Sequence, residues 1–529
     1  MGNSVNASVR PGAQKADYNH EHVWRCFWSS MAIITIYSMA HICARLLASP
    51  NLGEDDPLIN LYTQQAALGY GLDEPPLYTW IMYVVQQLTG PYLISFQLVK
   101  YAFVIATTGA LFWCAYAVTG HAVWSLVTAE ALTLIYHVGW RFHEGFAGLI
   151  PAMLCSVLAL LFVLRIIERQ RTIDFIGLGV ACGLGLLSQY SFVIGIGSFA
   201  LAALPVKAVR IRLYCVKLFL AIGICLILMM PHIMWIIDAP ARLNHFLSVY
   251  SAFTHPSPRI DVWRVVKKTL AAPFVFYWSL LLILLIAASE RAVRQSQFRH
   301  LLPKFDWRGQ PLLQFLGWYA IAAHCILFAS GIAVSHVTYA YHDLLSIMLP
   351  TLVLLFALIL QSQPDAEDIR RWAMISAGVL VFAFIARAAN MFVMEPFCKL
   401  CRWGIPYEQL AEELKSSGFE KGLIVGLEQD LAGNMRMYFP TSEIFSLGLK
   451  GLRPVWRQTR SGKPYVIVWQ IGGKHGLHDS REVIRQHLDA AGFKQQIQVF
   501  NAPWRHILRP DGYRQTEWNY VISSGLAGK

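Results

Sequence analysis

The sequence predicts a polytopic α-helical membrane protein with about 11 transmembrane helices and a C-terminal soluble α/β domain. The chain of 529 residues is 56% hydrophobic and only 14% charged, which is too apolar for a soluble globular protein. Apolar runs of roughly 20 residues, the length that crosses a bilayer, recur through the first three quarters. Beyond residue 391 the runs shorten, so we expect a transmembrane domain at 1–391 and an extramembrane domain at 392–529.

The positions of the apolar runs give the expected spans. No small-residue cleavage site separates the first run from the acidic loop that follows, so we expect this run to be retained as a helix. The expected spans are 27–48, 92–118, 121–138, 146–165, 173–189, 190–206, 214–237, 271–289, 314–334, 338–361 and 372–391.

Basic residues in the short loops give the expected orientation, because cytoplasmic loops are enriched in Lys and Arg. The basic loops fall on one side of the membrane in this count; they are 165–171, 207–212, 290–308 and 370–371. The loop at 51–75 has carboxylates and no Lys or Arg, and it falls on the other side with the C-terminal domain. The loop at 239–270 does not follow this rule, because it falls on the non-cytoplasmic side and is nevertheless basic. Either the loop contacts anionic lipid headgroups, or one helix is miscounted.

The C-terminal region has the pattern of a small α/β domain. A helix is expected at 407–415, ended by Gly418, and a second at 480–491. Strands are expected at 422–427, 465–469 and 496–500. No glycine-rich nucleotide fingerprint separates these elements, so no cofactor is assigned. Cys398 and Cys401 form a single CxxC pair outside the membrane, which favours a disulfide over a zinc site.

The run at residues 53–56 (Gly-Glu-Asp-Asp) is the most informative motif. Like charges that lie together raise each other's pKa, and none of them can be hidden in lipid. Three consecutive carboxylates at a membrane exit therefore indicate a functional site, with a solvated acidic loop as the alternative. The Gly-Tyr-Gly at 69–71 and the Pro-Pro-Leu-Tyr-Thr-Trp at 75–80 follow it.

These motifs, in this order, resemble the C-type (GT-C) glycosyltransferases, which use polyprenyl-phosphate sugars. The likeness is strongest to the bacterial branch related to protein O-mannosyltransferases, which includes the lipid A aminoarabinose transferase and the lipopolysaccharide galacturonosyltransferases. The residues that match the pattern of the first loop are Asp55, Asp56, Gln64, Gly69, Tyr70, Pro75, Pro76 and Leu77. Further matches are the glycine-rich segment at 183–190, the Pro-His-x-x-Trp at 231–235, and the galacturonosyltransferase-like segments at 406–411 and 432–440.

The resemblance implies an inverting transfer of a sugar from a polyprenyl phosphate to lipid A, lipopolysaccharide core or another envelope glycan. Such a transfer needs a carboxylate base for the acceptor hydroxyl and positive or hydrogen-bonding groups for the phosphate leaving group. Asp55 is the expected base, with Asp56 and Glu54 as alternatives. The expected phosphate contacts are His342, Tyr341 and His336, with Lys267 and Lys268 as further candidates.

Other expected substrate contacts lie in three segments. The first loop contributes Gln64 and Tyr70, and the glycine-rich segment contributes Gln189 and Tyr190. The second outer loop contributes His143 and Glu144, for which a solvated pair is the alternative. We expect membrane lipids to be partners as well. No metal site is assigned, although loop carboxylates suit a divalent ion. The net charge of +12 is scattered rather than gathered in a stripe, so nucleic acid is not expected.

The sequence departs from the family pattern at three positions, and the first two departures, at Gln189 and Leu344, indicate altered donor-phosphate contacts, a different donor or a lower activity. Gln189 stands where a basic residue is usual, Leu344 ends a segment that is often Lys-Asp-Arg, and Leu58 replaces a second, spaced carboxylate. The resemblance implies a location in the bacterial inner membrane, with the active site and C-terminal domain in the periplasm. The chain itself does not determine the sugar or the acceptor.

Two other functions remain open from the sequence. A lipid or glycolipid transporter would show inverted repeats and paired charges at mid-membrane depth. No repeat is evident, and the intramembrane charges that stand out are Arg45, Lys100 and Glu130. A glycolipid-binding paralogue that kept the fold and lost catalysis is the second alternative.

Overall fold

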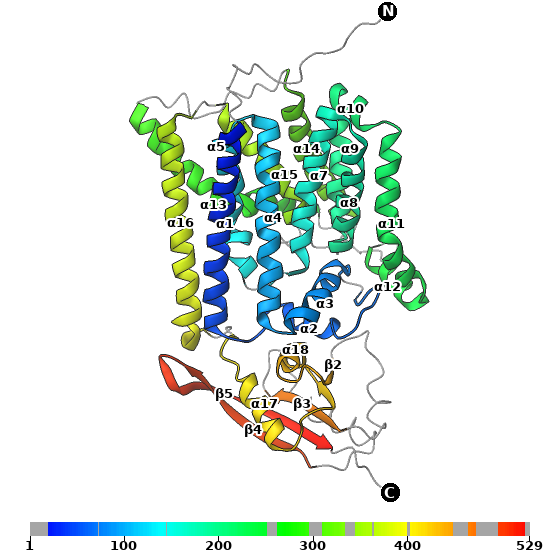
Figure 1. Ribbon diagram of the computed structural model, residues 1–529, viewed down its shortest axis with the longest axis vertical. Helices are drawn as coiled ribbons and strands as arrows, with labels where there is room; N and C mark the ends of the chain where they lie inside the picture. Colours follow the sequence, from blue (N-terminus) through cyan, green and yellow to red (C-terminus); the bar gives the residue numbers. More distant parts are fainter. Residues whose placement is uncertain are drawn as a thin grey trace, which may run out of the picture.

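The computed structural model confirms the multi-pass helical architecture. Each expected span coincides with a helix or a bent helix pair, and the helices stand side by side in one bundle (Figure 1). The structure describes residues 20–71, 74–143, 145, 147–250, 262–295, 309–333, 344–361, 364–398, 402–447, 464–471 and 496–523.

The bundle contains long helices, two bent pairs and two shorter apolar helices. Among the described residues, seven helices are long and apolar enough to cross a membrane, or up to nine if each bent pair is one span. The bent pairs are α5–α6 and α9–α10, and the shorter helices are α8 and α15. The helices are α1 His20–Ala48, α4 Leu93–Thr119, α5 Ala122–Glu130, α6 Tyr136–Gly139, α7 Ile150–Arg169, α8 Thr172–Ser188, α9 Phe192–Ala203, α10 Lys207–Leu213, α11 Lys217–Ile237, α12 Pro240–Tyr250, α13 Val262–Gln295, α14 Pro311–Ala333, α15 Leu345–Leu360 and α16 Ala366–Phe392.

The interior of the bundle lies along α4, α7 and α15. Phe112 of α4, Leu160 of α7 and Leu349 of α15 are fully buried in one apolar cluster. Small residues bring other helices close together, as is usual where lipid supplies no hydrophobic drive between helices. A Cβ at Gly179 of α8 would lie 2.5 Å from the carbonyl oxygen of Ala221 in α11, so only glycine allows this approach.

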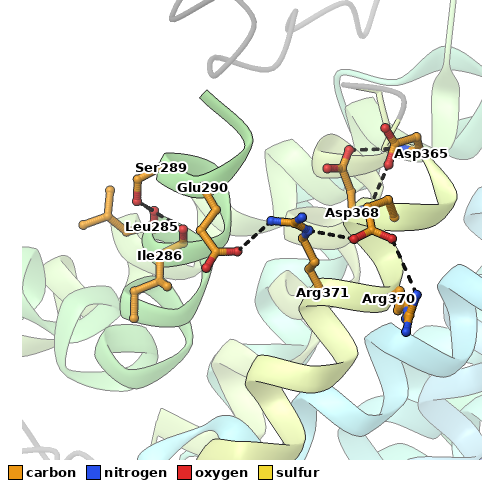
Figure 2. Close-up of polar contacts among 9 residues, drawn as sticks. Leu285, Ile286, Ser289, Glu290, Asp365, Asp368, Arg370 and Arg371 are labelled. Atoms are coloured by element: carbon orange, nitrogen blue, oxygen red, sulfur yellow. Dashed lines mark hydrogen bonds and ion pairs between the residues drawn. The ribbon is translucent and has the colours of Figure 1, made fainter. Parts of the chain in front are cut away.

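An ion-pair network joins α13 and α16 (Figure 2), and it lies at the end of the bundle far from the sheet (Figure 1). Arg371 Nε lies 2.9 Å from Glu367 of its own helix, and Arg371 Nη1 lies 3.7 Å from Glu290 of α13. Asp365 and Asp368 form a reciprocal capping box that starts α16. Charges of this kind need water, so the network marks an end of the bundle that leaves the membrane.

The described residues of the C-terminal region form a five-stranded mixed sheet with two helices, in agreement with the predicted α/β domain. The strand order is β2-β1-β3-β5-β4; β1 pairs in parallel with β2 and β3, and β5 pairs antiparallel with β3 and β4. Its core contains Val468, Trp518 and, from α17, Leu410, all fully buried. The elements are α17 Tyr407–Ser416, β1 Leu423–Gly426, α18 Gln429–Tyr438, β2 Glu443–Ser446, β3 Tyr465–Ile471, β4 Gln498–His506 and β5 Arg509–Ser523.

Details of this region agree with the sequence patterns where they are described. Gly418 follows α17 with φ +89°, the left-handed conformation that ends helices. Cys398 is disulfide-bonded, and Cys401 lies outside the described residues. The helix expected at 480–491 also lies outside them.

The sheet domain lies at one end of the bundle, beside the short helices α2 (Asp56–Tyr62) and α3 (Leu77–Thr89) (Figure 1). Both helices belong to the segment between α1 and α4, which contains the acidic run. The acidic run therefore lies between the membrane helices and the sheet domain.

Candidate active site

The three carboxylates of the acidic run have different surroundings. Glu54 is exposed and has φ +48°, a left-handed conformation that costs a non-glycine residue about 1 kcal/mol or more. Asp55 is half-buried and precedes α2, whereas Asp56 begins that helix and is 2% exposed. The second outer loop lies against Glu54, since a Cβ at Gly145 would be 2.4 Å from the Glu54 Cβ.

Asp56 faces two other buried polar side chains. Its Oδ1, the hydroxyl of Tyr78 in α3 and Nζ of Lys100 in α4 are all buried without a hydrogen-bond partner among the described residues. Burial raises the pKa of Asp56 to about 6, against the opposing positive charge of Lys100. Burial and the negative charge of Asp56 raise the pKa of Tyr78 well above its usual value. Asp56 thus lies within electrostatic range of a buried amino group and a buried hydroxyl group.

Arg45 fixes the chain between α1 and the acidic run. Its guanidinium donates to the carbonyl oxygens of Ser49, at 2.6 Å, and of Asn51, and it lies 4.1 Å from the ring centroid of Trp403. The Asn51 amide donates in turn to the carbonyl oxygens of Trp403 at 2.9 Å and Ile405 at 2.8 Å. The approach to the acidic run is therefore attached to the C-terminal region.

Helix α18 packs directly on α2. A Cβ at Gly433 would lie 2.2 Å from the carbonyl oxygen of Pro57, so glycine is required for this contact. Asn434 Oδ1 accepts from the Leu52 amide at 2.8 Å, just before the acidic run. Arg436 is buried and donates to Thr63 Oγ1 at 2.6 Å and to the Thr63 carbonyl oxygen at 3.1 Å. The sheet domain thus holds both ends of the acidic segment.

Gln64 joins α2 to the sheet. Its Nε2 donates to the Ile444 carbonyl oxygen at 2.7 Å, and its Oε1 accepts from the Ile444 amide at 2.8 Å. This side chain pairs with the β2 backbone as a neighbouring strand would. Its expected role in substrate binding stays a prediction.

The motifs at 69–71, 183–190 and 231–235 meet beyond α2. The Tyr190 hydroxyl and His232 Nε2 lie 2.7 Å apart, and His232 Nδ1 lies 3.2 Å from the Leu68 carbonyl oxygen. Gly69 packs on the face of Trp235, where a Cβ would come within 2.4 Å. Three motifs that are far apart in sequence therefore form one wall.

The sequence is similar to a known protein family and to two bacterial transferases. A family model described as dolichyl-phosphate-mannose-protein mannosyltransferase matches residues 73–235. Lipopolysaccharide core galacturonosyltransferase RgtB of Rhizobium johnstonii is 23% identical over 91% of this chain and 95% of its own. RgtA of the same organism is 22% identical over 85% of this chain and 88% of its own.

The fold matches that of a solved transferase. ArnT from Cupriavidus metallidurans bound to undecaprenyl phosphate superposes with a TM-score of 0.56 and 13% identity, over 94% of this chain and 99% of that one. The chain is similar to the GT-C glycosyltransferases in sequence and in fold. The match to ArnT covers 94% of the chain, the sheet domain as well as the bundle, so the chain has the whole architecture that the sequence motifs predict.

His143 is buried between aromatic side chains. Its Nε2 lies 2.8 Å from the Tyr37 hydroxyl, its Nδ1 is hydrogen-bonded to the Tyr101 hydroxyl, and its ring stacks on His41 with centroids 3.7 Å apart. The solvated pair considered as an alternative is wrong for His143, because both ring nitrogens are bonded inside the protein. Glu144 lies outside the described residues.

The remaining expected contacts are only partly described. Gln189 is buried and its Oε1 accepts from Ser346 Oγ at 2.9 Å. The Tyr70 hydroxyl donates to the Gln65 carbonyl oxygen at 3.1 Å. Lys267 and Lys268 are exposed on α13, and the residues outside the described part of the chain are His336, Tyr341 and His342.

The described part of the chain contains no group of three His, Cys, Asp or Glu side chains placed to hold a metal ion; Asp73, Glu144 and Asp343 are not in that part. The sequence patterns did not assign Tyr78 or Lys100 to the site. Lys100 could have been recognised as a site residue, because it is a charged residue within an apolar span. Tyr78 could not, because aromatic residues are common at membrane interfaces.

Proposed function

We propose that this transferase moves a sugar from a polyprenyl-phosphate donor to a lipid A, lipopolysaccharide core or other envelope glycan acceptor, with inversion at the anomeric carbon. The observation that carries the proposal is the buried site of Asp56, Tyr78 and Lys100 beside the acidic run of a GT-C fold. Support for the substrate classes comes from the galacturonosyltransferase relatives and from the undecaprenyl phosphate in the ArnT structure.

The reaction uses one carboxylate as a general base. The base removes the proton of the acceptor hydroxyl, the acceptor oxygen bonds to the anomeric carbon, and the bond from that carbon to the phosphate oxygen breaks. Polyprenyl phosphate leaves with the electron pair. Asp55 is the proposed base, and Asp56 is the alternative that its raised pKa favours, since a base works best with a pKa near the operating pH.

Lys100 is the proposed electrostatic partner of an acidic group of the substrate. Its ammonium is fully buried in α4 and has no hydrogen-bond partner among the described residues. A preorganised cation in a water-excluded site stabilises negative charge far better than one in water. Tyr78 adds a hydroxyl donor at the same site.

We place this chemistry on the periplasmic face of the bacterial inner membrane. The acidic run and the sheet domain share one end of the bundle, and the described basic segments at 165–171, 207–212 and 370–371 lie toward the other (Figure 1). A lipid-linked donor suits that face, because nucleotide sugars are confined to the cytosol.

The test is a transfer assay with purified protein in liposomes. Donors are undecaprenyl phosphates that carry galacturonate, aminoarabinose or mannose, and acceptors are lipid A and lipopolysaccharide core. Asp55→Asn and Asp56→Asn are compared with Glu420→Gln, an exposed control in the sheet domain. We expect one Asp variant to lose roughly 100-fold or more in rate with its fold intact. Wild-type protein that binds these lipids but turns none of them over would contradict the proposal and favour a transporter or a binding paralogue.

A further inference from the structure

The β4–β5 hairpin ends in an exposed apolar turn. Ile507 and Leu508 form the two-residue connection, and they are 82% and 54% exposed. Two-residue hairpin turns normally use Asn, Asp or Gly, whose backbones suit the tight turn and whose surfaces suit water. A pair of large aliphatic side chains at this position indicates that the tip contacts something less polar than water.

The tip is fixed beside the end of α16. The Arg509 guanidinium lies 5.7 Å from the ring centroid of Phe397, and the Tyr513 hydroxyl donates to Glu395 Oε1 at 3.2 Å. Arg514 donates to the carbonyl oxygen of Cys398. The hairpin therefore contacts the first residues that follow α16, and its turn lies beside that end of the helix (Figure 1).

The end of α16 exposes apolar side chains at the same place. Val393, Met394 and Phe397 are 45%, 49% and 60% exposed. Helix α16 is itself a candidate span, and little of its most apolar window is covered by the rest of the protein. A lipid-facing helix of 27 residues is about 40 Å long, longer than the hydrocarbon core of roughly 30 Å, so its end lies at the interface.

Basic residues flank the apolar tip. Arg505 and Arg509 are exposed on either side of the turn, with Asp511 as the nearest exposed acid along the chain. Apolar side chains flanked by arginine are typical of segments that lie in an interface and contact anionic headgroups.

We propose that the hairpin tip inserts into the headgroup region of a membrane that contains anionic lipid. The hairpin patch consists of Val393, Met394, Phe397, Ile507 and Leu508 with Arg505 and Arg509. This contact gives the sheet domain a second attachment to the membrane, in addition to α16. It holds α18, and with it the acidic segment, at a fixed height above the bilayer. The inference depends on the membrane location of the bundle and not on the chemistry proposed above.

The test is photo-crosslinking of the full chain in lipid nanodiscs. The photoreactive residue p-benzoylphenylalanine replaces Ile507, and the matched control carries it in place of Val499, an equally apolar residue of β4 that is 57% exposed and distant from the tip. In nanodiscs with phosphatidylglycerol, mass spectrometry is expected to find severalfold more lipid adduct at 507 than at 499. Equal lipid labelling at the two positions, or adducts at 507 to protein only, would overturn the proposal.

The charge requirement has its own test. The double variant Arg505→Glu, Arg509→Glu is expected to lower lipid labelling at 507 in phosphatidylglycerol nanodiscs to the level found in phosphatidylcholine. Both arginines are exposed, and the bonds of Tyr513 to Glu395 and of Arg514 to Cys398, which hold the hairpin beside α16, are left in place. Labelling that does not respond to either the variant or the lipid would contradict the role of anionic headgroups.

Discussion

The two sides of the acidic segment differ in how their polar groups are satisfied. On the side of the sheet domain, Gln64, Asn434 and Arg436 each make two or more hydrogen bonds. On the side of the membrane helices, Asp56 Oδ1 and the polar ends of Tyr78 and Lys100 are buried without one among the described residues. Buried polar groups are normally paired, so the first side is built for stability and the second is available to a ligand.

The difference has an energetic meaning. An unpaired buried polar group costs about 1–3 kcal/mol and a charged one more, against a total stability of roughly 5–15 kcal/mol. A fold keeps such groups where function needs them. Variants on the sheet side should therefore lose stability, and variants on the membrane side should lose activity while the fold persists.

Arg436→Met is expected to have the largest effect on stability. The substitution leaves buried acceptors at Asn60 and Thr63 without their donor, so we expect the free energy of unfolding to fall by about 3 kcal/mol. Thermal unfolding in detergent measures this loss. Arg402→Met is the matched control, because it breaks only a partly exposed pair with Asp430, worth about 1 kcal/mol or less. Equal midpoints for the two variants would contradict the assignment of this side to stability.

The pH dependence of activity tests the membrane side. If ionised Asp56 is required, kcat/KM falls about tenfold for each pH unit below about 6, the pKa that burial gives this carboxyl. The free energy of unfolding changes in the opposite direction. The pKa of Asp56 in the folded state exceeds its ordinary value of 3.8, so the folded state binds the proton more tightly and gains stability as the pH falls from 7 toward 4. A rate profile that stays flat down to pH 5 would exclude Asp56 as the ionising group.

Lys100→Met separates charge from packing. Loss of a charged contact of about 1.5–3 kcal/mol lowers kcat/KM for the donor by about 10- to 100-fold. Removal of the positive charge also raises the pKa of Asp56, so the acid limb of the profile moves to higher pH. Thermal stability should be unchanged or higher, because an unpaired buried cation is removed. Lys207→Met, an exposed control, should change none of these quantities.

The sequence predicted the bundle well because transmembrane helices carry their signal locally. A run such as 93–119 is apolar over its whole length, so no tertiary information is needed to find α4. The helix at 407–415 and the strands at 422–427 and 465–469 were also found, because amphipathic and buried patterns are local too.

The site was predicted less completely, because its partners come from distant segments. The acidic run itself was found, but the electrostatic interaction of Asp56 with Lys100 depends on where the fold places α2 relative to α4. The stacking of His143 on His41 likewise depends on the packing of a loop against α1, about 100 residues earlier. Composition can mark such residues, and only the fold brings them together.

Gln64→Ala is the smallest expected effect and tests an assignment made from sequence. Its two bonds to the Ile444 backbone are partly buried, so their loss costs about 1 kcal/mol of stability. If Gln64 only fixes the sheet to α2, kcat/KM changes by less than about threefold, since Asp56 and Lys100 keep their places. If Gln64 also binds substrate as the family motif implies, kcat/KM falls by about tenfold or more in addition to the same loss of stability. Steady-state kinetics and thermal unfolding of this one variant therefore decide whether Gln64 only attaches α2 to the sheet, as the other hydrogen-bonded residues on that side do, or also binds substrate.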